Sequence, residues 1–247
     1  MKRDLDKYYS DYINQPFEKI QVSYRKNKVL ERLGHYNPKR ILEVGVGTQS
    51  QLLLDFEFEK LNIIEPSKVF YNLNKKLIKD NKIKNVTIEN CFFEQFDSNA
   101  SFDFILISSL LHEIEDLDIF IKKLIQICSN KTVVHINVPN ANSFHRLLAK
   151  SMGIINNTRE KSKSNIKLQT SRIFDIISLE KLIRVNDFKI LHKESFFIKP
   201  FTHEQMQKML NSEIINIDIL NGLYNLNFDN LESNDFLGSE LIVEFTV

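Results

Sequence analysis

The sequence R-I-L-E-V-G-V-G-T-Q-S at residues 40–50 sets the expectation for the whole chain. A short apolar run ends in an acid, Glu43, and is followed by two glycines one residue apart. This pattern predicts a buried strand that runs into a tight turn. Gly45 and Gly47 can adopt backbone angles closed to other residues and let a ligand approach the main chain. Doubly wound folds bind nucleotide-like ligands at such a loop, at the carboxyl end of the first parallel strand.

The rest of the chain alternates strand-like and helix-like segments, as in a parallel, doubly wound sheet. Apolar residues at helical spacing predict a helix before the first strand, and Gly34 supplies its stop. The polar, basic stretch that follows the fifth strand predicts a mobile loop. The first predicted strand is the apolar run from Arg40 that ends in Glu43, and the others are 61–65, 86–90, 102–108, 132–138, 188–198 and 238–247. The predicted helices are 17–33, 51–58, one starting at Pro66, 116–128, 143–150 and 176–185; the mobile loop is 156–169, and 201–236 is a helical insertion.

Composition excludes several classes of protein. A chain of 247 residues fits one large α/β domain with a lid better than two domains. A formal charge of +1 gives no global argument for nucleic-acid or membrane binding. Cys91 and Cys128 are too few for a disulfide framework or a metal cluster, which indicates reduced thiols in the cytosol. The charged amino terminus does not resemble a signal peptide, and the longest apolar stretch, 102–111, is far shorter than the ~20 residues that span a bilayer. We therefore expect a cytoplasmic protein without membrane insertion.

A glycine turn with nearby acids occurs in two classes of ligand-binding site, one of which is the dinucleotide site. The spacing of the glycines and acids helps to decide between them. The dinucleotide fingerprint requires a third glycine three residues after the second, where this chain has Ser50. Glu43 stands two residues before the first glycine, a position at which the dinucleotide pattern requires no acid. The spacing weakens the case for an NAD-dependent oxidoreductase, and a purely structural turn is a further alternative.

The segment Glu43-Val44-Gly45-Val46-Gly47 resembles the acid-x-Gly-x-Gly signature of class I S-adenosylmethionine (SAM)-dependent methyltransferases. The order of elements is similar to that family over most of the chain. The resemblance implies an α/β fold: a Rossmann-like, doubly wound, seven-stranded sheet whose seventh strand is antiparallel, with helical lid insertions. It also implies a single domain over 1–247, with an N-terminal helical cap at 1–36 and substrate-side insertions at 143–178 and 199–237.

The same resemblance implies how the cofactor is held. In the family the glycine loop faces the amino-acid part of SAM, and an acid after the second strand binds the ribose hydroxyls, which matches Glu65. The loop after the third strand holds the adenine; here Cys91 stands where an acid is common, and Gln49 stands where a third glycine is frequent. The implied cofactor is SAM, with S-adenosylhomocysteine (SAH) as product and no metal. The implied cofactor-binding residues are Glu43, Gly45, Gly47, Glu65, Pro66, Cys91, Phe92 and Ser108.

A general base is required only if the methyl acceptor is a neutral hydroxyl, which loses its proton as the new bond forms. A histidine that titrates near pH 7 suits that task. The run Ser108-x-Leu110-x-His112-Glu113 resembles the family's motif beside the methyl group and acceptor, so His112 is the first catalytic candidate, with Glu113 beside it and His145 second. A hydrogen-bonded rim position for His112, a helix-capping role for Glu113 and a solvated surface position for His145 are the alternatives.

An acceptor that is already an anion needs no base and instead requires cations to hold it. Arg146, Arg172 and Lys199 fit that role, as does the basic run between 159 and 167, although such a run is more often a solvated loop. The helix before the first strand either packs only or closes over the site. The full set of substrate candidates is Tyr24, Arg25, Arg146, Arg172, Lys199 and His203.

The segments 138–146 and 199–206 are similar to small bacterial methyltransferases of surface-polysaccharide pathways. That resemblance implies O-methylation of a small polar metabolite, such as a sugar, a nucleotide-linked or a phosphate- or phosphoramidate-bearing precursor of a capsule or surface glycan. The expected partner is thus a small molecule, anionic in one version, and no nucleic acid. An NAD-dependent oxidoreductase and a non-catalytic SAM-binding subunit remain as alternatives. The sequence identifies neither the acceptor atom nor the oligomeric state.

Overall fold

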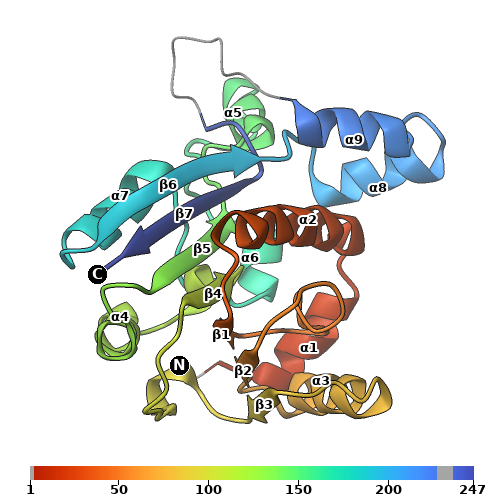
Figure 1. Cartoon of the computed structure of the whole chain (residues 1–247). Coiled ribbons are helices and arrows are strands. Elements are labelled where there is room, and N and C mark those ends of the chain that lie inside the picture. The colour runs from red at the N-terminus through yellow and green to blue at the C-terminus, as the bar shows by residue number, and fades with distance from the viewer. Residues whose placement is uncertain (1–2, 227–235) are drawn as a thin grey trace.

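The computed structural model describes residues 3–226 and 236–247, and its centre is a seven-stranded sheet in the order β3-β2-β1-β4-β5-β7-β6 (Figure 1). Neighbouring strands from β3 to β5 pair in parallel, whereas β7 is antiparallel to both β5 and β6. This confirms the predicted doubly wound sheet with an antiparallel seventh strand. The strands are β1 Arg40–Val44, β2 Lys60–Ile64, β3 Val86–Glu89, β4 Phe104–Ser108, β5 Val133–Pro139, β6 Lys189–Phe196 and β7 Glu240–Thr246.

Helices cover both faces of the sheet. Helices α4 and α7 lie on one face and α2 and α3 on the opposite face, while α8 and α9 lie beyond one end of β6 (Figure 1). The helices are α1 Leu5–Ile13, α2 Glu18–Tyr36, α3 Lys68–Asp80, α4 Leu117–Ile127, α5 Phe144–Ser151, α6 Lys163–Lys167, α7 Ile176–Arg184, α8 His203–Asn211 and α9 Ile217–Asn225, with 3-10 turns η1 Phe93–Gln95 and η2 Leu111–Glu113. No helix in these described ranges is long and apolar enough to cross a membrane.

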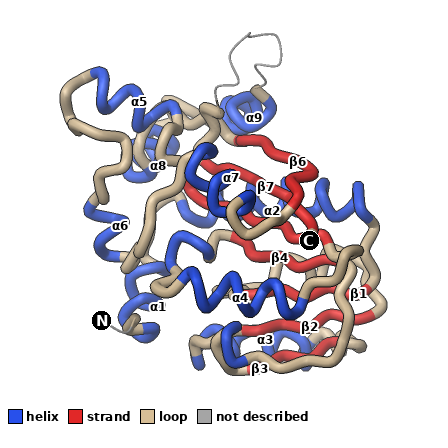
Figure 2. Tube along the Cα trace, turned by 90° about the vertical axis from the view of Figure 1, so that its left-hand side faces the viewer, coloured by secondary structure: helices blue, strands red, loops and turns tan. Residues whose placement is uncertain are grey.

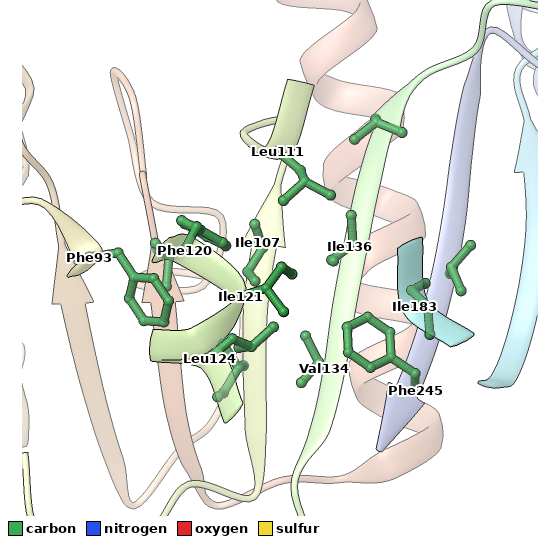
Figure 3. Packing of buried hydrophobic residues seen from close by; sticks show 14 of the residues in the cluster. Phe93, Ile107, Leu111, Phe120, Ile121, Leu124, Val134, Ile136, Ile183 and Phe245 are labelled. Atoms are coloured by element: carbon green, nitrogen blue, oxygen red, sulfur yellow. The ribbon is translucent and has the colours of Figure 1, made fainter. Parts of the chain in front are cut away.

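A large apolar cluster fills the space between the sheet and the α4–α7 layer (Figure 3). Phe120 and Leu124 of α4 share this cluster with Val134 and Ile136 of β5, and all four side chains are fully buried. The central strands are apolar throughout because helices remove both of their faces from water. Burial of each such side chain contributes roughly 1.5–3 kcal/mol relative to an exposed position.

Two further clusters complete the core. On the opposite face, Val29 and Leu33 of α2 pack over the sheet. A third cluster attaches α8 and α9: the ring of Tyr24 in α2 stacks on Phe197 and on Tyr224, with ring centroids 4.7 and 4.9 Å apart. The helical insertion predicted at 201–236 is therefore confirmed over α8 and α9, and its residues 227–235 lie outside the described ranges.

The predicted helix at 51–58 is wrong, because residues 51–55 form turns and 56–58 have no regular structure. The amide groups that would begin such a helix are taken by side chains from elsewhere in the fold. Glu43 accepts the backbone N–H of Gln51 at 3.0 Å, and Asn74 of α3 accepts that of Ser50 at 2.7 Å. The chain after the first strand is thus held as a compact turn.

Smaller differences concern helix ends and loops. The helix predicted over 17–33 continues through Gly34 and ends at Tyr36, where Asn37 adopts a left-handed conformation and its N–H bonds to Leu33. Helix α1, which Asp4 caps through the backbone N–H of Lys7, lies within the predicted N-terminal helical cap at 1–36 but was not predicted as a separate helix. The short helix α6 lies within the polar segment 156–169 that was predicted as a loop.

Candidate functional site

A cavity of about 90 Å³ lies at the carboxyl ends of β1, β2 and β4. After β1 the chain winds outward to β2 and β3 on one side and then returns to β4 on the other, so β1 and β4 flank the switch point of the sheet. Open α/β sheets bind ligands at this crevice. The segment before α2 also contributes to the wall. The lining residues include Arg3, Tyr8, Tyr12, Arg25, Glu43, Gly45, Gly47, Gln51, Glu65, Pro66, Phe70, Ser108, Leu110 and Glu113.

The two glycines serve different purposes in this wall. Gly45 has φ +73° and Gly47 has φ +59°, conformations that strain other residues. A Cβ atom on Gly45 would lie 2.9 Å from Cδ2 of Leu110, so a side chain there would also displace its neighbour. A Cβ atom on Gly47 would meet no atom within 4 Å, so the space beside this backbone is open to a ligand.

The carboxylate of Glu43 is engaged in hydrogen bonds to the loop that follows it. Its buried carboxylate accepts the Ser50 hydroxyl and the Gln51 backbone N–H, and burial raises its pKa to about 7. Asn74 supports the same loop from α3, because its amide donates to the carbonyl of Gly47 at 3.0 Å. Asn74 was not foreseen from the sequence, since it lies in the middle of an amphipathic helix and nothing nearby marks it.

Glu65 follows β2 and faces the glycine loop across the cavity. Its two oxygens accept the backbone N–H groups of Ser67 at 2.8 Å and Gly47 at 3.2 Å. Burial raises its pKa to about 7. The backbone N–H of Val46 also bonds to this carboxylate, and since a carboxylate has about four acceptor sites, capacity remains for a hydroxyl group of a ligand.

The loop after β3 lies against the loop after β2. The side chain of Asn90 donates to the carbonyls of Glu65 at 2.8 Å and Pro66 at 3.0 Å, which ties the two loops together. Pro66 lines the cavity, whereas Cys91 and Phe92, both partly buried, do not. Cys91 packs against the large apolar cluster instead.

The turn after β4 closes the floor of the cavity. Ser108 accepts a hydrogen bond from the side chain of Gln51 at 2.7 Å. Gln51, from the segment 51–58 that was wrongly predicted as a helix, therefore contributes to the site. Ser109 has φ +52°, an uncommon conformation for a residue with a side chain. Leu110 follows it and covers Gly45.

Glu113 reaches the cavity from η2 and binds the N-terminal segment. It accepts the hydroxyl of Tyr8 at 2.7 Å and forms an ion pair with Arg3 at 2.9 Å, and burial raises its pKa. The cap of α4 is Asp116, so Glu113 does not take the capping role considered above. Tyr8 and Tyr12 both contact the ring of Phe70 edge-on.

Helix α1, which carries Tyr8 and Tyr12, therefore covers one side of the cavity. Figure 2 shows α1 next to α6, and the backbone N–H of Asp4 donates to the side chain of Gln169 at 2.9 Å. Lys167 also forms an ion pair with Asp11 at 3.5 Å. The aromatic spacing of residues 8, 9 and 12, together with the capping residue Asp4, is a signal in the sequence that could have marked this helix.

Neither predicted histidine lines the cavity. His112 is buried beside Glu113, with its Nε2 3.8 Å from the carboxylate, and its carbonyl accepts the N–H groups of Ser171 and Arg172. Burial, together with the charge of Arg25, lowers the pKa of His112 to about 3, and burial lowers that of His145 to the same value. The expectation that either histidine titrates near pH 7 is therefore wrong.

Arg25 is the one predicted substrate residue that lines the cavity. Its Nε and Nη2 bind both oxygens of Glu240 at 2.6–3.0 Å, and Gln21 and Asn137 donate to the same carboxylate. Tyr24 points away from this site into the third apolar cluster, where its hydroxyl donates to Asn221.

Arg146 and Arg172, which were predicted to bind the substrate, both donate hydrogen bonds to backbone carbonyls. Arg146 donates to the carbonyls of Thr158 and Glu160, and exposed Arg172 donates to that of Glu115. Neither arginine lines the cavity.

Lys199 and His203 lie outside the cavity lining. Lys199 is 4% exposed, and burial lowers its pKa to about 8. His203 begins α8 with its Nδ1 3.8 Å from the carboxylate of Glu18. Within 3–226 and 236–247, no group of three His, Cys, Asp or Glu side chains is arranged to hold a metal ion.

A sequence-family model described as a methyltransferase domain matches residues 17–193. A search of curated proteins gives no match.

Solved structures share the fold. The plantazolicin methyltransferase BamL, in complex with a triazolic desmethylPZN analog and SAH, is 19% identical with a TM-score of 0.60, covering 93% of this chain and 86% of that one. Phospholethanolamine N-methyltransferase 2 of Haemonchus contortus is 15% identical with a TM-score of 0.61, covering 89% and 52%. A SAM-dependent methyltransferase from Clostridium acetobutylicum ATCC 824 is 10% identical with a TM-score of 0.56, covering 91% of both chains. At these identities the likeness concerns the fold alone.

Proposed function

The chain belongs to the methyltransferase-domain family, and from this premise we propose that it transfers the methyl group of SAM to an oxygen atom of a small polar acceptor. One observation carries the cofactor assignment. At the switch point of the sheet, the buried carboxylate of Glu65 faces the open backbone of Gly47. A carboxylate with free acceptor capacity suits a ribose diol, and an open glycine backbone suits a ligand that lies close to the main chain.

The remaining cofactor residues then take distinct tasks. Gly45 and Gly47 contact the amino-acid part of SAM, and Glu43 keeps their loop in shape through Ser50 and Gln51. Pro66 and Ser108 border the cofactor, and Cys91 with Phe92 flank the adenine end. When bound, SAM supplies a methyl group on a positively charged sulfur, and transfer of that group to the acceptor leaves neutral SAH.

Glu113 is the residue that we assign to the acceptor proton. It lines the cavity, and a carboxylate whose pKa is raised by burial is a better proton acceptor at neutral pH than an imidazole with a pKa of about 3. The Tyr8 hydroxyl and Arg3 hold the ionised form of Glu113 in position. His112 and His145 stay neutral and serve as hydrogen-bonding groups.

The nature of the acceptor follows from the sequence resemblance. We propose a sugar, nucleotide-linked or phosphate- or phosphoramidate-bearing precursor of a bacterial capsule or surface glycan, methylated in the cytoplasm. In this proposal the chain acts as one domain, in which residues 1–36 form a cap and residues 143–178 and 199–237 form the acceptor side. Two of the structural neighbours are complexes with small molecules, a desmethylPZN analog and phosphomonomethylethanolamine, which agrees with an acceptor of that size.

A thermal-shift comparison of SAM, SAH and NAD tests the cofactor assignment. A ligand at about 100 times its dissociation constant stabilises the folded protein by roughly 2.7 kcal/mol. We expect such a shift with SAM and SAH and none with NAD. Glu65→Gln loses a charged acceptor, worth ~1.5–3 kcal/mol, and should weaken SAH binding about 10- to 150-fold. Glu59→Gln, which changes an exposed acid, is the matched control.

The outcomes separate the alternatives. A shift with NAD alone would support an oxidoreductase instead. A shift with SAH, but no transfer of labelled methyl groups to any of a panel of sugar phosphates and nucleotide sugars, would support a non-catalytic subunit. Unchanged SAH binding in Glu65→Gln would contradict the assignment of the ribose to that residue.

A further inference from the structure

Two N–H donors of the Arg3 guanidinium group lack an acceptor. Arg3 stands just before α1 and lines the cavity. Its Nε and Nη2 are buried, yet neither makes a hydrogen bond within the described ranges 3–226 and 236–247. Nη2 lies 2.9 Å from Oε2 of Glu113, an ion pair that lacks the alignment of a hydrogen bond. Buried donors without acceptors are unfavourable, so each such pair of atoms in a cavity wall calls for an explanation.

The two atoms form one edge of the planar guanidinium group, and this chain shows what such an edge binds. Arg25 holds Glu240 through its Nε and Nη2 at 2.6–3.0 Å. Arg32 holds Glu244 through the same two atoms at 2.7–3.1 Å. The edge suits a carboxylate because two parallel N–H groups meet two oxygens. Arg3 presents the same edge, and no carboxylate of the described residues is hydrogen-bonded to it.

The charges around the cavity make this arginine the cation that is available to a ligand. Among the described residues that line the cavity, Glu43, Glu65 and Glu113 are acids, and only Arg3 and Arg25 are basic. Arg25 is engaged by its buried ion pair at 2.6 Å. SAM carries positive charge on its sulfonium and ammonium groups and negative charge on its α-carboxylate. An acidic cavity with one available arginine matches that distribution of charge.

Arg3 is placed so that it can turn this edge to a ligand. It belongs to no helix or strand, so its side chain can rotate without breaking a backbone hydrogen bond of either. The chain beside it is anchored, because the N–H of Asp4 donates to the side chain of Gln169 at 2.9 Å. The guanidinium carbon lies 4.6 Å from the centre of the Tyr8 ring, which holds the guanidinium plane in the wall of the cavity.

We propose that Arg3 binds a carboxylate group of a ligand in this cavity through its Nε and Nη2. The α-carboxylate of SAM is the expected source, and a carboxylate of the methyl acceptor is the other. This assignment rests on the proposed function in taking SAM as the cofactor. A guanidinium group has five N–H donors, so Arg3 can serve the ligand and stay paired with Glu113. The N-terminal segment then contributes a ligand contact as well as a cover.

The test compares SAH with decarboxylated SAH, which lacks only the α-carboxylate. By calorimetry, Arg3→Met should bind SAH about 10- to 150-fold more weakly than the wild type, through loss of a charged hydrogen bond, and decarboxylated SAH with wild-type affinity. Arg3→Lys keeps the charge without the planar edge, so its affinity for SAH should fall between the two. Arg184→Met, which changes an exposed arginine of α7, should bind both ligands like the wild type.

The Arg3 side chain gives a direct readout in protein labelled with ¹⁵N-arginine, where Arg3→Met identifies its Nε–H resonance by its absence. SAH should move this resonance downfield, as a hydrogen bond to a carboxylate does, and decarboxylated SAH should not. Acetate is titrated into the SAH-bound protein at constant ionic strength with chloride. If acetate moves the resonance saturably and SAH does not, the carboxylate comes from the acceptor.

A resonance that neither SAH nor acetate moves would overturn the proposal. So would equal weakening of SAH and decarboxylated SAH in Arg3→Met without a response to acetate, because Arg3 would then have a structural role alone. Wild-type protein that binds SAH while Arg3 responds to no carboxylate sinks this inference and leaves the proposed function standing. Failure of the wild type to bind SAH counts against the proposed function, and acetate titration of the ligand-free protein then decides for or against Arg3.

Discussion

Binding of SAH should be coupled to a proton at Glu65. In the ligand-free protein, burial raises the pKa of this carboxyl group to about 7, although the backbone N–H groups of Ser67 and Gly47 oppose the shift. Ribose hydroxyls donate hydrogen bonds to the ionised form, so a bound ligand lowers the pKa again. SAH should therefore bind more tightly as the pH rises from 6 to 8, and binding at pH 6 should release a proton.

The size of the effect follows from the shift. If the bound carboxylate returns to its ordinary pKa of 4.5, the dissociation constant at pH 6 is about tenfold larger than at pH 8. At pH 6 nearly every binding event releases about one proton, and at pH 8 almost none does. His112 and His145, each with a pKa of about 3, are neutral throughout this range and do not contribute.

Isothermal titration calorimetry in two buffers of different ionisation enthalpy measures the affinity and the proton count together. Glu65→Gln should bind SAH weakly and with a flat pH profile. Glu43→Gln should keep the profile, because the Glu43 carboxylate is occupied by Ser50 and Gln51. An equally steep profile in Glu65→Gln, or a flat one in the wild type, would refute the assignment of the coupled proton to Glu65.

Three further changes test the scaffold. Gly45→Ala should lower the free energy of unfolding by about 1–2 kcal/mol, because it strains a left-handed backbone and presses on Leu110. Gly34→Ala, in the interior of α2, should raise the free energy of unfolding by about 0.5–1 kcal/mol. Urea unfolding of both variants measures the two changes. Arg25→Met leaves Glu240 buried without its cation and should cost about 3–5 kcal/mol, and a cost below 1 kcal/mol would mean that the pair is not sealed from water. Hydrogen bonds from His135 and Arg32 outweigh burial and lower the pKa of Glu244 to about 2, so its stabilisation is complete above pH 4.5 and is lost as the pH falls through 2. Glu244→Gln should therefore cost up to about 3 kcal/mol at pH 7 and little near pH 2, which unfolding curves at both pH values would show.

The residues on the cofactor side of the site could be predicted from the sequence because of the geometry of a parallel sheet. Glu43, Gly45, Glu65 and Ser108 each stand at or just beyond the carboxyl end of a strand, and parallel strands bring these ends to one edge of the sheet. Recognition of the strands was therefore enough to expect the four residues at one cavity. The error at residues 51–58 shows the limit of periodicity, because side chains of β1 and α3 hold that segment in turns.

The acceptor side depended on contacts between distant segments. Arg25 meets Glu240 across more than 200 positions of sequence, and Tyr8 meets Glu113 across more than 100. The sequence around Arg25 or around Tyr8 gives no indication of the residue that each one contacts in the fold. Arg146 looked as suitable a cation as Lys199 in the sequence, and the carbonyls that occupy it became visible only in the folded chain.

The glycine-rich turn, the acids at strand ends and the alternation of strands and helices are local patterns, and they were sufficient for the doubly wound sheet, the position of its ligand cavity and the family. The protonation states of the histidines and the buried ion pair between Arg25 and Glu240 were not, because each depends on how much water and which opposite charges remain around a side chain after folding. Burial moves the pKa of His112 to about 3 and those of Glu43 and Glu65 to about 7. Local sequence specifies which groups are present, and long-range packing specifies the dielectric and the partners that give those groups their chemistry.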